Sequence, residues 1–415
     1  TTGVSNTLIG ALSGDALTEG TRNTAVGISA LSGDTLGSKA VAVGRNALLA
    51  QNFTTATDNY NVAVGDSAGQ AVTTGFYNTL IGGLAGDALT DADYNTALGT
   101  LSLSADTLGS KSTALGYGTL DTQNFTTATD TFNTAVGFNA GTAVTTGVRN
   151  TLIGSLAGDA LTDADSNVAV GTNALGADTL GSKSIAIGQG SLFNQNFTTA
   201  TDSHNIAIGH EAGLNVTTGV QNTLIGSTSG DALTDADKNV ALGFAALGTD
   251  TLGSKSTAIG DSALGSQNFT TATDTFNTAV GFEAGARITT ATSNTVIGSE
   301  AGDSLTTGAA NVALGASALG ADTLGQHNVA IGYQALDAQN FTTTTNAYNV
   351  AVGSAAGGAV TTGTLNTFIG GLAGDAVTTG RYNTSLGYQS LSNETTGEFN
   401  TAIGYNALAT QNRTD

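Results

Sequence analysis

NVAVGDSAG, at residues 61–69, contains the five-residue phrase that decides the fold. Phrases of this type, such as NTAVG or NVAVG, occur 23 times, and each ends on a glycine, from Gly10 to Gly404. The intervals between successive glycines are 17, 17, 21 and 17, so the whole pattern has a 72-residue period. A fixed period of this size means that each unit buries its apolar face only by stacking on its neighbours. The sequence therefore predicts a repeat architecture in which one phrase marks one coil.

The composition suits a thin, regular all-β core. Apolar residues make up 40% of the 415 residues, and the chain contains no Trp, Met, Cys or Pro. Proline would remove a backbone donor from every stack, so its absence fits a chain whose amides are committed to neighbouring coils. No linker interrupts the repeat. We expect an all-β parallel solenoid of 23 coils, built from 17-residue and 21-residue coils and continuous over residues 1–415 with no globular domain boundary.

Charge and hydropathy exclude some classes of partner. The chain has 32 acidic and 11 basic residues, a net charge of −21, which disfavours nucleic acid and anionic membrane surfaces. This charge favours solubility and association with cations or cationic partners. Because no apolar run approaches the length of a membrane-spanning helix, we also expect no membrane insertion.

The strand within each phrase has two apolar faces. The residue before the glycine is Ile, Val or Leu in all 23 copies, which predicts a buried row. The residue before that points the opposite way, and it is usually Ala, with a large residue on every fourth coil. We expect one face to be covered by the rest of its own coil and the other by a neighbouring chain. A second short strand should follow the glycine. The candidates for the chain-facing side are Leu80, Ala97, Ala135 and Leu152.

Asparagine stands four residues before the glycine in 19 of the 23 copies. Asn tolerates turn conformations and can bond to backbone amides or to the next Asn in a stack. We therefore predict a structural ladder at the corner before the strand. Its members include Asn61, Asn78, Asn95, Asn133, Asn150 and Asn167.

Longer phrases resemble known fibre repeats. NTAVGFNAG at 133–141, NVAIGYQAL at 328–336 and NTAIGYNAL at 400–408 are similar to the head repeats of YadA-like trimeric autotransporter adhesins, and more so to the NTAIGYxAL repeats of phage tail-fibre proteins. The resemblance implies a left-handed parallel β-roll, three identical chains side by side, and extracellular display on a virion or cell surface. YadA-like heads have a shorter repeat, written NSVAIG, and no membrane anchor, coiled-coil stalk or self-cleaving tip domain is visible in this chain.

The 21-residue coils carry a four-residue insertion with the text QNFTTATD, first at 51–58. Extra residues in a solenoid bulge outward, often on the binding face. The phenylalanine in this text recurs with the 72-residue period, about 19 Å apart at the usual strand spacing. Capping of each loop's own small core is the favoured interpretation, and receptor contact is the alternative. The residues are Phe53, Phe125, Phe197, Phe269 and Phe341, and each lies in an NFT glycosylation sequon.

Three central coils read GDALTDAD and contribute three aspartates each. Carboxylates at one corner are ligands suited to Ca²⁺, so calcium is the one cofactor that the sequence suggests. The spacing matches no known calcium loop, and a solvated acidic face is the favoured interpretation. These residues are Asp87, Asp91, Asp93, Asp159, Asp163, Asp165, Asp231, Asp235 and Asp237.

Other polar residues suggest no catalytic site. Lys39 lies five residues after Asp34 in a DTLGSK turn, which predicts an ion pair that recurs in three later coils. His327 occupies the place of those lysines in a fifth coil. No nucleophile, base and acid stand in a recognisable catalytic spacing, so we expect no enzyme activity.

A structural and adhesive fibre segment, in a virion tail fibre or a bacterial surface appendage, is the function that these observations favour. It would be a homotrimer, act as a stiff spacer, and present repeated contacts to a host-surface glycan or protein. A Thr-rich ice- or mineral-binding solenoid and a non-adhesive filament are the alternatives. A polysaccharide depolymerase would need paired carboxylates in a groove with a sugar platform, and the sequence shows no such platform.

Overall fold

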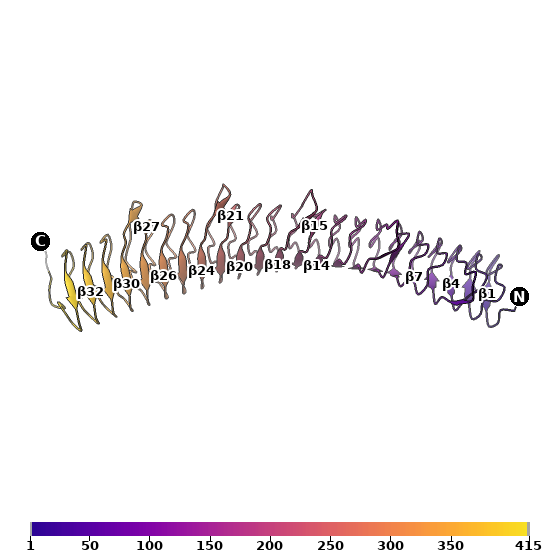
Figure 1. Ribbon diagram of the computed structural model, residues 1–415, viewed down its shortest axis with the longest axis horizontal. Coiled ribbons are helices and arrows are strands. Elements are labelled where there is room, and N and C mark those ends of the chain that lie inside the picture. The colour runs from indigo at the N-terminus through magenta and orange to yellow at the C-terminus, as the bar shows by residue number, and fades with distance from the viewer. Residues whose placement is uncertain (1, 413–415) are drawn as a thin grey trace. The chain divides into compact units, whose positions relative to one another are not determined.

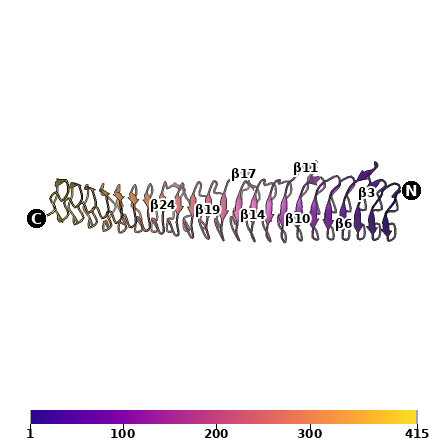
Figure 2. The same ribbon diagram turned by 90° about the horizontal axis from the view of Figure 1, so that it is seen from below.

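A computed structural model describes residues 2–412. The chain divides into two compact units, Thr1–Asn205 and Ile206–Asp415. Each unit is a parallel β-solenoid, and the described residues form about 23 turns and contain no helix. The all-β solenoid class is therefore confirmed, whereas one unbroken solenoid over residues 1–415 stays a prediction. Figure 1 shows the strands of each unit following one another coil by coil, and Figure 2 shows the same order from a view turned by 90°.

One three-residue strand per coil forms the long sheet of each unit. In the first unit these strands are β1 (Thr7–Ile9), β2 (Thr24–Val26), β4 (Val41–Val43), β6 (Val62–Val64), β7 (Thr79–Ile81), β8 (Thr96–Leu98), β10 (Thr113–Leu115), β12 (Thr134–Val136), β13 (Thr151–Ile153), β14 (Val168–Val170) and β16 (Ile185–Ile187). In the second unit they are β18 (Ile206–Ile208), β19 (Thr223–Ile225), β20 (Val240–Leu242), β22 (Thr257–Ile259), β24 (Thr278–Val280), β25 (Thr295–Ile297), β26 (Val312–Leu314), β28 (Val329–Ile331), β30 (Val350–Val352), β31 (Thr367–Ile369), β32 (Thr384–Leu386) and β33 (Thr401–Ile403).

Register is uniform, because each strand pairs in parallel with the same three positions of the next coil. Ala63 of β6, for example, lies beside Leu80 of β7, and Leu80 lies beside Ala97 of β8. A single phrase with a fixed spacing thus places equivalent residues in rows that run from coil to coil.

Two-residue strands form a second kind of pairing at the 21-residue coils. They are β3 (Gly37–Ser38) with β5 (Thr57–Asp58), β9 (Gly109–Ser110) with β11 (Thr129–Asp130), β15 (Gly181–Ser182) with β17 (Thr201–Asp202), β21 (Gly253–Ser254) with β23 (Thr273–Asp274), and β27 (Gly325–Gln326) with β29 (Thr345–Asn346). The inserted loops project beyond the neighbouring coils, as Figure 1 shows near β21 and β27.

Among residues 2–412, the second strand predicted after each glycine is absent from the ordinary coils. Residues 66–71, for example, form turns. These turns still bond to the next coil, because the Gly69 amide donates to the Ala85 carbonyl and the Ala71 amide to the Asp87 carbonyl. Left-handed backbone at Ser67 and Gly69 keeps this segment out of a strand. The turn therefore stacks like a strand without having the extended geometry of one.

The phrase glycine marks the corner after the strand. Gly65 has a φ of +143°, and a Cβ placed on it would lie 2.3 Å from the carbonyl oxygen of Gly82 in the next coil. No L side chain fits this combination of backbone angle and close approach. This explains why the glycine recurs at the same place in every phrase.

The predicted direction of the strand faces is wrong. The central residue of each strand points into its own coil, and the four residues proposed to face a neighbouring chain, Leu80, Ala97, Ala135 and Leu152, are fully buried there. The residue before the glycine, predicted to be buried, is on the outside: Ile9 is 60% exposed and Leu98 42%.

Size complementarity is the physical reason for this direction. Leu80 lies between two glycines: a Cβ on Gly69 would lie 2.7 Å from Leu80 Cδ1, and a Cβ on Gly86 would lie 2.8 Å from Leu80 Cδ2. Most coils with Ala at the strand centre have a buried leucine at the glycine position, as the coil of Ala97 has Leu103. The coil of Ala63 has Gly69 there instead, and the large strand residue of the next coil, Leu80, fills that space.

The asparagine ladder is present at the corner before the strand. Asn78 is fully buried, its Oδ1 accepts the Asn95 amide at 2.9 Å, and its Nδ2 donates to the Ala92 carbonyl at 2.7 Å. The same pair of bonds links Asn61 to the coil of Asn78. Asn133, Asn150 and Asn167 continue the ladder. Each buried amide therefore satisfies one donor and one acceptor of the backbone, which unpaired would cost about 1 to 3 kcal/mol each.

Candidate functional site

The main candidate site is the outer face of the long sheet in each unit. We define this outer face as the first and third residues of every long-sheet strand. The third residue is Val, Ile or Leu in all 23 strands, and 11 of these side chains are between 36% and 66% exposed. The first residue is Thr in 14 strands and Val or Ile in the others. Isolated exposed apolar residues are ordinary, but an unbroken row of them signals a surface that another molecule covers.

Aromatic side chains border the outer face at both ends of the strands. Before the strands, Tyr60, Tyr77 and Tyr94 stack in consecutive coils with ring centroids 5.3 and 5.2 Å apart, and each is 43% to 51% exposed. After the strands, Tyr117 stacks on Phe138 at 5.6 Å. The second unit has the same arrangement, with Tyr382 on Phe399 before the strands and Tyr388 on Tyr405 after them. The borders therefore add apolar surface to the outer face.

Carboxylates are nearly absent from this region. Of the 32 acidic residues, only Asp66 and Asp261 lie in the outer face or its two bordering rows. Asp66 is paired with Arg45 through two hydrogen bonds of 2.7 and 2.8 Å, and this guanidinium holds the pKa of Asp66 below its usual value. The charge of −21 is thus carried by other sides of the coils. The outer face itself has no ionisable residue, and its two bordering rows hold eight of the 11 basic residues.

The five loop phenylalanines lie inside their loops. Phe53, Phe125, Phe197, Phe269 and Phe341 are only 5% to 6% exposed. The rings are packed inside the loops, as the favoured interpretation expects, and receptor contact through them stays an untested alternative. The exposed loop residues are their neighbours, such as Asn52, Thr54 and Thr55. The loop surface is therefore polar and rich in hydroxyl and amide groups.

The loop lysines pair with a different aspartate from the one predicted. Lys39 contacts Asp58 of the inserted loop at 2.6 Å and donates to the Tyr60 hydroxyl at 2.6 Å, which raises the pKa of Lys39. Equivalent pairs join Lys111 to Asp130, Lys183 to Asp202 and Lys255 to Asp274. In the fifth loop both partners change together, to His327 and Asn346, and the histidine stacks on Tyr348.

Asp34, the predicted lysine partner, belongs instead to a buried polar network under the loop. Its carboxylate accepts hydrogen bonds from Gln51 Nε2 at 2.7 Å and from the amides of Gly37 and Phe53. Gln51 in turn accepts from Asn61 of the ladder. The network recurs at the equivalent aspartates, and burial raises the pKa of three of them against the effect of their hydrogen bonds. These three are Asp106, Asp178 and Asp322.

Sequence reasoning missed this network, although a signal was present. Asp34 and Gln51 stand at a position where most other coils have Val, Leu or Ile, as at Val72 and Leu89. A polar residue at an otherwise apolar position of a repeat marks either a solvent-exposed site or a buried hydrogen-bonded one. The recurrence of both residues in successive 72-residue repeats pointed to the second.

The aspartate triplets do not converge on one point. Asp91 accepts from the Thr74 hydroxyl at 2.5 Å, and Asp93 accepts from the Phe76 amide at 2.9 Å. Asp87 has one buried carboxylate oxygen without a hydrogen-bond partner, and burial raises its pKa. Between residues 2 and 412, no group of three potential ligands is arranged to hold a metal ion. Calcium binding stays a prediction.

No family model matches the chain, and no curated protein is similar to it in sequence. Among residues 2–412, no helix is long and apolar enough to cross a membrane.

Proposed function

We propose that this chain is a structural and adhesive fibre segment that assembles side by side with copies of itself outside the cell. The unbroken apolar third row of the outer face carries this proposal. Removing apolar area from water contributes about 25 cal/mol per Å², so a partly exposed apolar row with a member in every described coil strongly favours a covering partner.

A second copy of the chain is the occupant that fits this row. The row repeats at every coil, so its partner must present apolar groups at the same spacing over the same number of coils. Another copy of the chain meets this requirement, because it has the same apolar residues at the same coil spacing. The near absence of carboxylates from the outer face also lets copies approach despite a charge of −21 on each.

The resemblance of the repeats to phage tail fibres and YadA-like heads supports a homotrimer of left-handed rolls, displayed on a virion or a bacterial surface. Three outer faces turned toward a common axis would cover one another, because each apolar row would then contact two others. The acidic sides and the inserted loops would remain outside. Loops that recur with the 72-residue period would then multiply weak contacts to a host surface, which raises avidity without any tight individual site.

Sedimentation of the purified chain tests the proposal. We expect a trimer that does not dissociate on dilution. Leu98→Lys together with Leu115→Lys, in adjacent strands of the outer face, should prevent assembly, because each copy would bring two unpaired charges into the apolar contact. Thr55→Lys, at an exposed loop position, is the matched control and should assemble normally. A stable monomer of the unmodified chain would refute the proposal.

Ice or mineral binding is the second candidate, and the threonines of the outer face favour it. Thr occupies the first strand position in 14 of 23 coils, beside the apolar third row. Such a face could order water only if it stayed uncovered in solution. Thermal hysteresis measured on a chain that sediments as a monomer would support this candidate, and its absence would leave the fibre as the only proposal.

A further inference from the structure

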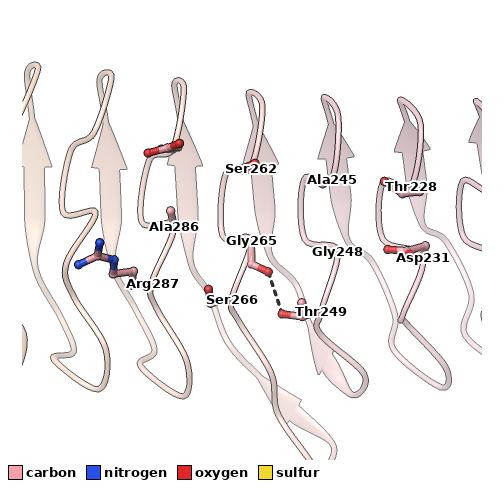
Figure 3. Close-up of a pocket in the computed structure, with 11 residues that line it drawn as sticks. Thr228, Asp231, Ala245, Gly248, Thr249, Ser262, Gly265, Ser266, Ala286 and Arg287 are labelled. Atoms are coloured by element: carbon pink, nitrogen blue, oxygen red, sulfur yellow. Dashed lines mark hydrogen bonds between the residues drawn. The ribbon is translucent and has the colours of Figure 1, made fainter.

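A pocket of about 480 Å³ lies on the surface of the second unit, over the segments that follow β19, β20, β22 and β24. Its lining comes from four successive coils, with Asp231 and Arg287 at opposite ends (Figure 3). Gly248 and Gly265 form the middle of the floor, where neither contributes a side chain. The pocket is separate from the outer face of the sheet, because its lining belongs to the turns after the phrase glycine.

The other repeats fill the equivalent place with a side chain. The positions equivalent to Gly265 in the other 72-residue repeats are occupied by Leu49, Asp121, Phe193, Asp337 and Ala409, so only the repeat of Gly265 has none. In the first unit, a Cβ on Gly176, the equivalent of Gly248, would lie 3.1 Å from Phe193 Cε2. The Phe193 ring therefore covers a glycine floor of the same kind. A six-membered ring is thus a shape that this floor accepts.

Polar groups surround the floor in the second unit. Thr249 donates its hydroxyl hydrogen to the Gly265 carbonyl at 2.8 Å, which leaves its oxygen able to accept a further hydrogen bond. The Asp231 carboxylate reaches over the floor, since its Oδ1 would lie 3.4 Å from a Cβ on Gly248. Ser262 adds a hydroxyl group to the lining, and Arg287 adds a guanidinium.

The polar groups around the floor, which we call the rim, are those of Asp231, Thr249, Ser262 and Arg287. They distinguish between an aromatic ring and a sugar ring as the ligand. An aromatic ring would cover the rim groups without bonding them, which costs free energy for every polar group that loses water. A sugar ring has hydroxyl groups around its edge for the rim and a C–H face for the glycine floor. The polar rim therefore favours a sugar.

The charged residues of the pocket lining limit which class of sugar can bind. Asp231 and Glu283 supply two carboxylates to the lining, against the single guanidinium of Arg287. Burial raises the pKa of the neighbouring Asp303, and the guanidinium of Arg287 partly opposes this effect. The net negative field disfavours acidic sugars and accepts neutral or amino sugars.

We propose that this pocket binds one neutral or amino pyranose residue of a surface glycan, with the face of the ring on Gly248 and Gly265. This inference rests on the adhesive part of the proposed function and gives it a ligand class. It also places the contact on the coil surface, next to the start of the inserted text at 267–274.

Saturation-transfer NMR on the full chain tests the inference. The probes are the methyl glycosides of glucose, galactose, N-acetylglucosamine and glucosamine, with glucuronic acid as the acidic comparison. We expect at least one neutral or amino probe to bind and glucuronic acid to bind more weakly. The inference fails if none of the neutral or amino probes binds, or if glucuronic acid binds best.

Two phenylalanine substitutions separate this pocket from other surfaces. Gly265→Phe copies the natural arrangement of Phe193 over Gly176 and should abolish binding of the probe. Asp337→Phe is the matched control, because it places the same side chain at the equivalent position of the next repeat, where the Asp337 carboxylate already lies 3.0 Å from a Cβ on Gly320. It should leave binding unchanged. Equal binding by the parent chain and Gly265→Phe would overturn the inference.

A rim substitution tests the role of the carboxylate. Asp231→Asn should weaken the binding of the probe about tenfold, because one charge-assisted hydrogen bond is lost while the floor is kept. Unchanged binding would refute the assigned rim contact. Sedimentation of the same samples distinguishes the proposed sugar site from the proposed trimeric assembly. A trimer that binds no probe refutes the sugar site alone. A monomer that binds a probe refutes the assembly alone.

Discussion

Leu80 and Gly86 offer the sharpest test of how this solenoid fills its interior. Leu80 is fully buried, and its two methyl groups occupy the space that the missing side chains of Gly69 and Gly86 leave open. Leu80→Ala should create a cavity and destabilise the surrounding coils by about 2 to 5 kcal/mol. Gly86→Ala should also destabilise them, by about 1 to 3 kcal/mol, because its Cβ would lie 2.8 Å from Leu80 Cδ2 and its backbone is left-handed.

The two changes should compensate each other in part. In the double variant the new Cβ of residue 86 enters space that Leu80 has vacated, although its contact with Leu89 Cδ1 at 2.8 Å remains. We therefore expect the loss of stability to be smaller than the sum of the two single losses by about 1 kcal/mol or more. Leu84→Ala, the same change at a residue that is 38% exposed in the same coil, is the control and should cost about 0.5 kcal/mol or less.

Hydrogen exchange of the amides in residues 79–89 is the suitable assay, since a solenoid opens locally and need not unfold as one unit. A loss of about 2 kcal/mol corresponds to a fall in protection of about 30-fold. Additive effects of Leu80→Ala and Gly86→Ala would contradict the packing described here. If Leu80 instead faced a neighbouring chain, Leu80→Ala would weaken assembly and leave exchange within the isolated coil as it is for Leu84→Ala.

The other predictions concern the polar groups. Asn78→Ala should cost about 1 to 3 kcal/mol by leaving the Asn95 amide and the Ala92 carbonyl without their partner, whereas Asn52→Ala in the exposed loop should cost far less, as read by hydrogen exchange. Because burial raises the folded-state pKa of Asp106, this residue contributes stability that is fully present below its unfolded pKa and is lost as the pH rises through its folded pKa. Asp106→Asn should flatten that dependence in exchange measured from pH 3 to pH 7, and an unaltered profile would refute the assignment. Lys111→Met should change thermal stability by no more than about 1 kcal/mol, since the pair with Asp130 is exposed. Removal of calcium with EDTA should leave the melting temperature unchanged, because Asp91 and Asp93 bond to neighbouring coils, and a fall would establish a calcium site.

Much of the fold could be predicted from spacing alone. Between successive 17-residue coils the interval places one Asn of the ladder over the next, so the hydrogen bonds that join Asn61 to Asn78 and Asn78 to Asn95 follow from the sequence. The glycine interval likewise predicts the parallel register of the strands. The inserted text predicts a projecting loop, and the preference of aromatic residues for packing correctly placed Phe53 inside it.

The surface pocket was beyond the reach of that reasoning. Gly265 looks like one glycine among 58, and its importance appears only where Phe193 is seen to cover Gly176 at the equivalent place. Similarly, Lys39 and Asp34 are close in sequence, yet the lysine pairs with Asp58 across the inserted loop. Contacts between coils join residues that are a whole coil apart in the chain, so short-range spacing cannot assign them.

The sequence by itself determined the coil length, the ladder, the register and the 72-residue rhythm, because these depend on one residue type recurring at fixed intervals. The tertiary structure decided which face of the strand is the inside. A strand alternates its side chains between two faces, and here both faces are apolar, so hydrophobicity alone cannot choose between them. The choice depends on fit across the coil: Leu80 has room only between Gly69 and Gly86, and the branched residues before each glycine are left on the outside.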